Sequence, residues 1–170
     1  MYQGHYGPAG VIHFLYTDIS FPWLIISTQI IDIAYFILVY CCKLFCNMDI
    51  QNCPYPIVCS EYTLYNADLM RAGKPFPFSG RVEFTHSLTG ALALTLPFTL
   101  LYQYINGRGK RSFASLYSIL LLGVSSHWLL DTLVHRPDMA ILPPLTKTLV
   151  GYGTWQDWSI WSNVEYTLCG

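Results

Sequence analysis

A long apolar segment at residues 20–46 constrains the fold of this chain more than any other feature. It exceeds the about 20 residues that a helix needs to cross the hydrocarbon core of a bilayer. Pro22 falls in the first turn of the predicted helix, where its missing amide donor does no harm. Two further apolar segments, at 82–105 and 113–135, are also long enough to span. The sequence therefore predicts an all-α, polytopic membrane bundle with three full spans.

The composition agrees with this fold class. Hydrophobic residues make up 53% of the chain and charged residues 11%, with a mean hydropathy of +0.36, whereas soluble domains carry about 25% charged residues. The length of 170 residues fits one integral-membrane domain, residues 1–170. The net charge of −1 gives no basic field for nucleic acid. We therefore expect the lipid bilayer, and no nucleic acid, as a partner.

The remaining segments are too short or too irregular to span. Residues 47–80 are rich in proline and polar residues and predict a long surface loop, with room for a short helix within 61–72. Short terminal helices are predicted for residues 4–17 and for the aromatic tail that starts at residue 157. Residues 136–156, with a Pro-Pro pair and a GYG triplet, form a second irregular stretch. The first ten residues match neither a signal peptide nor an Arg-rich transit peptide.

Six cysteines occur in the chain, and their positions favour at most one disulfide. Cys53 and Cys59 bracket the loop sequence CPYPIVC. This loop could close as a disulfide in an oxidising compartment and could equally stay reduced elsewhere. No CxxC pair indicates a zinc ribbon or a redox motif.

The sequence SSHWLLDTLVHRPD at the end of the third apolar segment carries the strongest functional pattern. It places His127, Asp131 and His135 four residues apart, a spacing that lines one stripe of a helix. Three ionisable side chains on one face of an apolar helix are costly unless they share a partner, and a divalent cation would supply one. We therefore predict a metal site on this helix.

Threading the spans through a bilayer brings further ligand-type residues to the same side. His86 lies near the start of the second span, and the third span returns to that side with Asp131. Asp32 lies near the middle of the first span, Glu165 follows in the final segment, and His5 joins if the first short helix inserts from that side. The predicted metal ligands are His5, Asp32, His86, His127, Asp131 and His135. The expected cofactor is a divalent metal, with zinc as the first candidate.

Isolated polar residues have simpler explanations. His13 and Asp18 fit packing roles better than ligand roles. Asp32 alone could equally be a helix–helix hydrogen-bonding residue. Arg136 and Asp138 fit a pair that ends the third helix.

The basic loop RGKR at residues 108–111 favours one orientation in the membrane. Under the positive-inside rule this loop would face the cytoplasm or the matrix of an organelle, so the metal ligands would lie at the opposite face. The other loops carry several basic residues too, so the bias is small. Either a bacterial inner membrane or an organellar inner membrane fits this expectation.

The order of these motifs resembles that of a known family. GHY near the start, QIID in the first span, FTHSLTGAL at the second, SSHWLLDTLVHRPD in the third and then GYGTW are similar to the bacterial membrane-bound metal-dependent hydrolases. These are described as LexA-binding, inner-membrane-associated hydrolases. The resemblance covers most of the chain outside residues 47–80.

The resemblance implies a site as well as a fold. His5, Asp32, His86, His127, Asp131 and His135 match the metal-site pattern of the family, and Glu165 matches a carboxylate of its final helix. Two departures stand out: the loop between the first two spans is enlarged, and the sequence ends where the family would complete its last membrane helix.

Two functions remain open at this level. The first is a metal-dependent hydrolase that acts on an ester or phosphoester near the membrane surface, with Asp32 or Glu165 as general base. The alternative is a catalytically silent accessory subunit of a larger membrane complex that retains the hydrolase-like fold, since 13 tyrosines and 5 tryptophans favour interfaces. A transporter is a distant third, because the spans are few and show no paired repeats.

Overall fold

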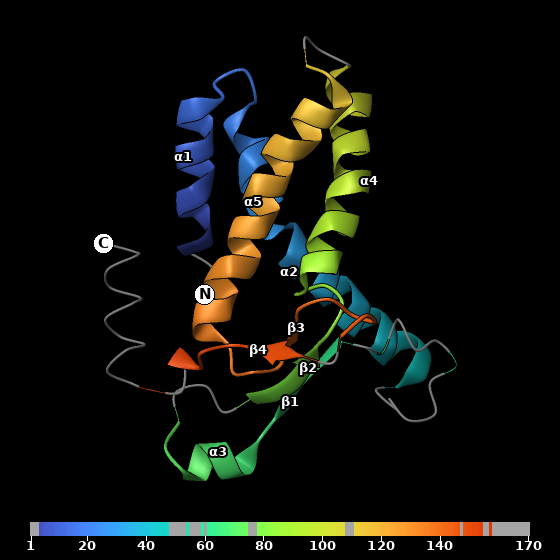
Figure 1. Ribbon diagram of the computed structural model, residues 1–170. Helices are drawn as coiled ribbons and strands as arrows, with labels where there is room; N and C mark the ends of the chain where they lie inside the picture. Colours follow the sequence, from blue (N-terminus) through green and yellow to red (C-terminus); the bar gives the residue numbers. More distant parts are fainter. Residues whose placement is uncertain are drawn as a thin grey trace.

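The computed structural model is mostly helical and describes residues 4–47, 54, 59, 61–74, 78–107, 111–146, 148–154 and 157. Three helices are long and apolar enough to cross a membrane: α2 (Phe21–Cys46), α4 (Leu88–Asn106) and α5 (Phe113–Val134). A shorter helix, α1 (Gly7–Leu15), follows the 3-10 turn η1 (Gly4–Tyr6) and packs beside α2 and α5 (Figure 1). The predicted all-α membrane bundle is confirmed.

The bundle is held by apolar packing between its four helices. Ala9 and Ile12 of α1 pack with Leu24 of α2, Phe98 of α4 and Leu120 of α5 in one buried cluster. Outward-facing positions on the spans are also apolar and leave many large side chains exposed, as expected of helices that face lipid.

The second span begins later than the sequence predicts. Residue 82 ends a strand, and α4 starts at Leu88, where the side chain of Ser87 accepts a hydrogen bond from the amide of Gly90. His86 therefore lies in the turn before the helix and not in its first turn. The reason is local, because serine caps a helix better than an apolar residue can start one.

A small sheet lies at one end of the bundle (Figure 1). Strands β1 (Glu61–Tyr65) and β2 (Phe78–Val82) form an antiparallel pair around the short helix α3 (Ala67–Arg71). Strand β3 (Met139–Ala140) pairs in parallel with β2, and β4 (Leu149–Val150) pairs antiparallel with β3. The 47–80 segment thus contains two strands that its sequence pattern did not indicate, and α3 lies in the range that favours a short helix.

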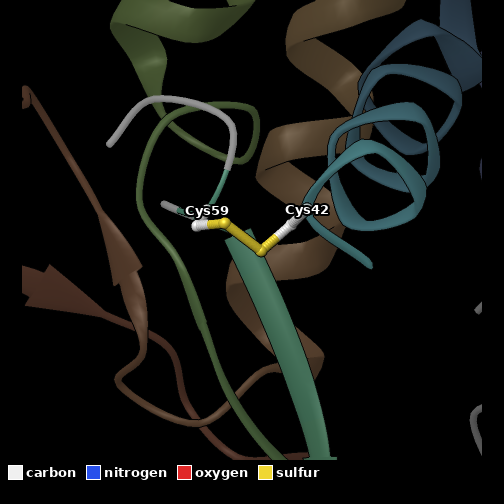
Figure 2. Close-up of a disulfide and its surroundings, with 2 residues drawn as sticks. All are labelled: Cys42 and Cys59. Atoms are coloured by element: carbon white, nitrogen blue, oxygen red, sulfur yellow. A yellow bond between two sulfur atoms is a disulfide. The ribbon is translucent and has the colours of Figure 1, made fainter. Parts of the chain in front are cut away.

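One disulfide joins the sheet to a membrane span (Figure 2). Cys59, two residues before β1, bonds to Cys42 in the last third of α2, with a Cα–Cα distance of 5.0 Å. The sequence indicated Cys53 and Cys59 as the pairable cysteines and left their disulfide open, but Cys59 bonds to Cys42, and Cys46 is disulfide-bonded too. Cys53 itself lies outside the described residues. Loop position suggested the partner, whereas the continuation of α2 to Cys46 brings Cys42 to the start of β1.

Candidate metal centre

Four side chains from three parts of the fold meet at the sheet end of the bundle. Asp32 comes from α2, His86 from the turn between β2 and α4, and His127 and Asp131 from α5. One ligand-type atom of each lies within 4.8 Å of all the others, close enough together to hold a metal ion. We refer to these four residues as the metal centre.

Each imidazole of the metal centre lies close to both of its carboxylates. His86 Nε2 lies 3.3 Å from Asp32 Oδ1 and 3.3 Å from Asp131 Oδ2. His127 Nε2 lies 3.5 Å and 3.1 Å from the same two oxygens. A tetrahedral zinc ion with ligands at about 2.1 Å separates its ligand atoms by about 3.4 Å. The four distances between imidazole nitrogens and carboxylate oxygens therefore match the spacing of ligand atoms around a zinc ion.

Helix packing sets the position of the His127 ring. Gly123, one turn earlier on α5, faces Ser27 of α2 so closely that a Cβ there would overlap the serine hydroxyl. This close approach lets His127 Nδ1 reach the backbone carbonyl of Thr28, at 2.5 Å. Because a carbonyl oxygen only accepts, Nδ1 carries a proton, and Nε2 is the ring atom that faces the metal centre. Such an outer hydrogen bond is typical of histidines that bind metal.

His86 is held from two sides. Its Nδ1 lies 2.9 Å from the hydroxyl of Thr85, so Nε2 is again the atom directed at the carboxylates. The ring of Tyr35 packs edge-on against it, with ring centroids 5.4 Å apart. Burial lowers the pKa of His86, but the hydrogen bonds to Asp131 and Asp32 outweigh burial and raise the pKa to about 9. The carboxylates thus favour a positive charge at the centre.

His135 lies at the edge of the metal centre. Its Nδ1 is 3.2 Å from Asp138 Oδ1, and its Nε2 is 3.8 Å from Asp131 Oδ2. It follows α5 directly as the C-cap residue, in extended backbone conformation. The carboxylate of Asp138 thus orients His135 as the Thr28 carbonyl orients His127.

The GYG triplet closes the end of α5 behind His135. The amide of Tyr152 donates to the carbonyl of Thr132, and the amide of Gly153 donates to that of His135. Gly151 has a φ of 145°, and a Cβ there would overlap the carbonyl oxygens of His135 and Arg136. One carbonyl of the last helical turn and the carbonyl of the C-cap residue are thereby satisfied, which helps to fix the end of the helix that carries the ligands.

His5 approaches the metal centre from η1 on the other side of Asp131. Its Nε2 lies 3.1 Å from Asp131 Oδ1, and its ring lies against that of His127 with centroids 3.9 Å apart. Burial lowers the pKa of His5, against the opposing effect of Asp131. Asp131 therefore faces His5 with one oxygen and the other histidines with the second.

Several buried polar atoms here lack a hydrogen bond. Within the described part of the chain, both ring nitrogens of His5, His127 Nε2 and Asp131 Oδ1 have no hydrogen-bond partner of acceptable geometry. Buried polar groups in folded proteins are nearly always paired. A divalent cation would bind His127 Nε2 together with the carboxylate oxygens that face it, so the residues present fit a metal ion.

Asp32 is the most exposed member of the metal centre. The side chains of His86, His127 and Asp131 are at most 4% exposed, whereas that of Asp32 is 19% exposed. Solvent therefore contacts the centre at Asp32 more than at its other three members. The other predicted catalytic carboxylate, Glu165, lies outside the described residues.

Sequence reasoning missed the groups that hold the ligands in place. The carbonyl of Thr28, the hydroxyl of Thr85 and the buried carboxylate of Glu61, which binds the turn before His86, carry no motif of their own. The alternation of EYTLY is a weak strand signal that could have drawn attention to Glu61.

Comparisons of the chain with protein-family models, with curated proteins and with solved structures gave no match.

Proposed function

We propose that this chain is an integral-membrane metalloprotein of hydrolase type that acts on an ester or phosphoester at the membrane surface. The observation that carries the proposal is the alternating set of 3.1–3.5 Å contacts between two imidazoles and two carboxylates, almost fully buried in an apolar bundle. The nitrogen and oxygen donors are those that zinc accepts, and catalytic zinc sites use histidine and carboxylate together.

The residues of the chain would divide the work of hydrolysis. When bound, a divalent ion supplies Lewis-acid chemistry: it polarises an ester or phosphoester oxygen and acidifies a water molecule. His86, His127 and Asp131 would hold the ion, with the Thr28 carbonyl fixing the tautomer of His127. Asp32, the most exposed of the four residues, would take up the proton that the water releases.

Two independent features support an orientation in the membrane. The Cys42–Cys59 disulfide lies at the end of the bundle that carries the metal centre, and disulfides persist in oxidising compartments. Arg111, the last residue of the basic sequence RGKR, lies before α5 at the opposite end of the bundle, and basic sequences between spans favour the cytoplasmic or matrix side. We therefore propose that the metal centre faces the oxidising side of a bacterial or organellar inner membrane.

A metal and activity assay on the detergent-purified chain tests the proposal. We expect about one equivalent of a divalent transition metal by elemental analysis, and hydrolysis of ester or phosphoester reporters in lipid vesicles. Chelation should abolish hydrolysis and zinc should restore it. Absence of any bound transition metal, with no change on His127→Ala, would contradict the proposal.

One observation favours the alternative, an accessory subunit of a larger membrane complex. The ligand-type residues come from η1, α2, the turn before α4 and α5, so a metal ion would link four segments and could serve as a structural brace alone. A chain that retains its metal, hydrolyses none of the reporters and co-purifies with other membrane subunits would support this second function.

A further inference from the structure

Glu61 is a fully buried carboxylate outside the metal centre. It is the first residue of β1 and its relative exposure is 0%. Burial of a charged group is costly unless hydrogen bonds compensate for it. The hydrogen bonds of Glu61 therefore show what its buried carboxylate stabilises.

Glu61 accepts two backbone hydrogen bonds from the turn that carries His86. Its Oε1 accepts the backbone amide of Phe84 at 2.5 Å and that of Thr85 at 2.8 Å. Its Oε2 is buried and has no hydrogen-bond partner among the described residues. One carboxylate oxygen thus fixes the two amides directly before His86.

The same turn is shaped from its other side as well. The hydroxyl of Ser87 donates to the carbonyl of Phe84 at 2.7 Å, and a Cβ at Gly90 would overlap that carbonyl oxygen. The turn is therefore closely packed from both sides, and a displacement of the amides bound by Glu61 would be passed to His86.

Glu61 is itself tied to a membrane span. The disulfide between Cys59 and Cys42 lies two residues before Glu61, and Cys42 is on the same helix as Asp32 (Figure 2). The path from α2 through the disulfide, Glu61 and the turn ends at His86, whose Nε2 lies 3.3 Å from Asp32. Asp32 and His86 are thus connected both directly and through the disulfide and Glu61.

We propose that Glu61 is a positioning residue for the metal centre: its carboxylate, held by the Cys42–Cys59 disulfide, fixes the turn at 84–85 so that His86 Nε2 faces Asp32 and Asp131. The proposal rests on the metal-binding function proposed above. It assigns Glu61 no contact with the metal and no step in catalysis.

The glutamate can be tested with two variants that differ in one property. In Glu61→Gln the amide oxygen still accepts both backbone amides, whereas Glu61→Ala removes the acceptor. With cobalt(II) as probe and a chelator as competitor, we expect Glu61→Gln to bind within about threefold of wild type and Glu61→Ala to bind about 10–100-fold more weakly, the usual effect of losing an outer hydrogen bond at a metal site. The visible spectrum of bound cobalt should change in Glu61→Ala, which reports the loss of a protein ligand. Asp68→Ala, an exposed carboxylate on α3, is the control and should bind as wild type.

A second measurement needs no metal. Hydrogen exchange of the peptide that covers residues 84–87 should accelerate in metal-free Glu61→Ala and stay close to wild type in Glu61→Gln. If wild type binds no cobalt, the proposed metal function fails, and this exchange experiment alone decides the role of Glu61. Unchanged exchange and unchanged cobalt affinity in Glu61→Ala would overturn the positioning role. Equal loss of cobalt in both variants, with the fold retained, would overturn it too, because the charge itself would then be required.

The disulfide supplies a further variant for the case that Glu61→Ala does not fold. Cys42→Ala with Cys59→Ala leaves Glu61 in place but removes this one covalent link to α2, and we expect cobalt affinity to fall about 3–10-fold, with Cys41→Ala, a free cysteine on the same helix, unchanged. Wild-type affinity in the double variant would remove the disulfide from the proposal.

Discussion

Ionisable side chains lie at both ends of the helical bundle, and the two groups differ in how their partners satisfy them. At one end, Arg111 makes two hydrogen bonds to the carboxylate of Asp18, at 2.6 and 2.7 Å, and stacks over the ring of Tyr16. At the other end lies the metal centre, where each histidine Nε2 faces two carboxylate oxygens. Asp18 and Arg111 satisfy each other with hydrogen bonds, whereas polar atoms of His127 and Asp131 have no hydrogen-bond partner among the described residues.

Burial explains the difference between them. The side chains of Asp18 and Arg111 are 53% and 30% exposed, so water completes their solvation. Those of His127 and Asp131 are 0% and 3% exposed, and His127 Nε2 finds no hydrogen bond within the described residues. A carboxylate thus makes a weak surface ion pair in one place and belongs to a buried group that could hold a metal ion in the other. The predictions below test this contrast.

The largest effect is expected for Asp131→Asn. Asp131 lies within 3.3 Å of His5, His86 and His127, so loss of its charge removes the group that all three share. We expect metal affinity to fall more than about 100-fold and thermal stability to fall by about 3–5 kcal/mol, as for a broken buried ion pair. Elemental analysis and thermal unfolding in detergent measure both quantities. A variant that keeps stoichiometric metal would show that Asp131 is not a ligand.

His127→Ala should come next, with His13→Ala as its matched control. His127 faces the carboxylates of Asp32 and Asp131. His13 lies on α1 and has a hydrogen bond with the backbone carbonyl of Ile19 instead. We expect about a 100-fold loss of metal affinity in the first variant and none in the second. Equal affinities in the two variants would mean that histidine content, not this site, governs metal binding.

A smaller effect is expected for His135→Ala. Its Nε2 is 3.8 Å from Asp131, the longest of the histidine contacts with this carboxylate. We expect metal affinity to fall about 10-fold, as for a residue at the edge of the site. A chelator titration monitored by cobalt absorption measures the change. A loss as large as that of His127→Ala would make His135 a full ligand and enlarge the metal centre.

The smallest effect is expected for Arg111→Gln, with no change in metal affinity. An exposed ion pair contributes at most about 1 kcal/mol, and salt screens it. The hydrogen bonds from Arg111 lower the pKa of Asp18. The stabilisation is therefore present above the ordinary carboxyl pKa and is lost as the pH falls through the lowered value. Unfolding at neutral and acidic pH should show the difference between variant and wild type shrinking in acid; a constant difference would contradict this account.

The spans were predictable because hydropathy is a local property. The segment predicted at 20–46 forms α2, and the segment predicted at 113–135 forms α5, each within one residue at either end. The start of the second span was not predictable to the same degree. An apolar stretch can continue from a strand into a helix, and only the serine cap at Ser87 separates the two.

The ligand-type residues were found from spacing and topology, and the groups that orient them were not. His127, Asp131 and His135 share a helix stripe, which is a sequence property. The acceptor of His127 is a backbone carbonyl on another helix, at Thr28, and any residue type carries such a carbonyl. No side-chain pattern in the sequence can therefore predict this hydrogen bond.

By itself the sequence determined that this chain forms apolar spans with a few ionisable residues at one end, because helix periodicity and hydrophobic length are encoded residue by residue. Only the tertiary structure decided that Asp32 and His86 meet Asp131, that Cys59 bonds to Cys42, and that Glu61 holds the turn before His86. These contacts join positions far apart in the chain. They depend on how closely the helices approach, as Gly123 allows against Ser27, and on where each helix begins and ends.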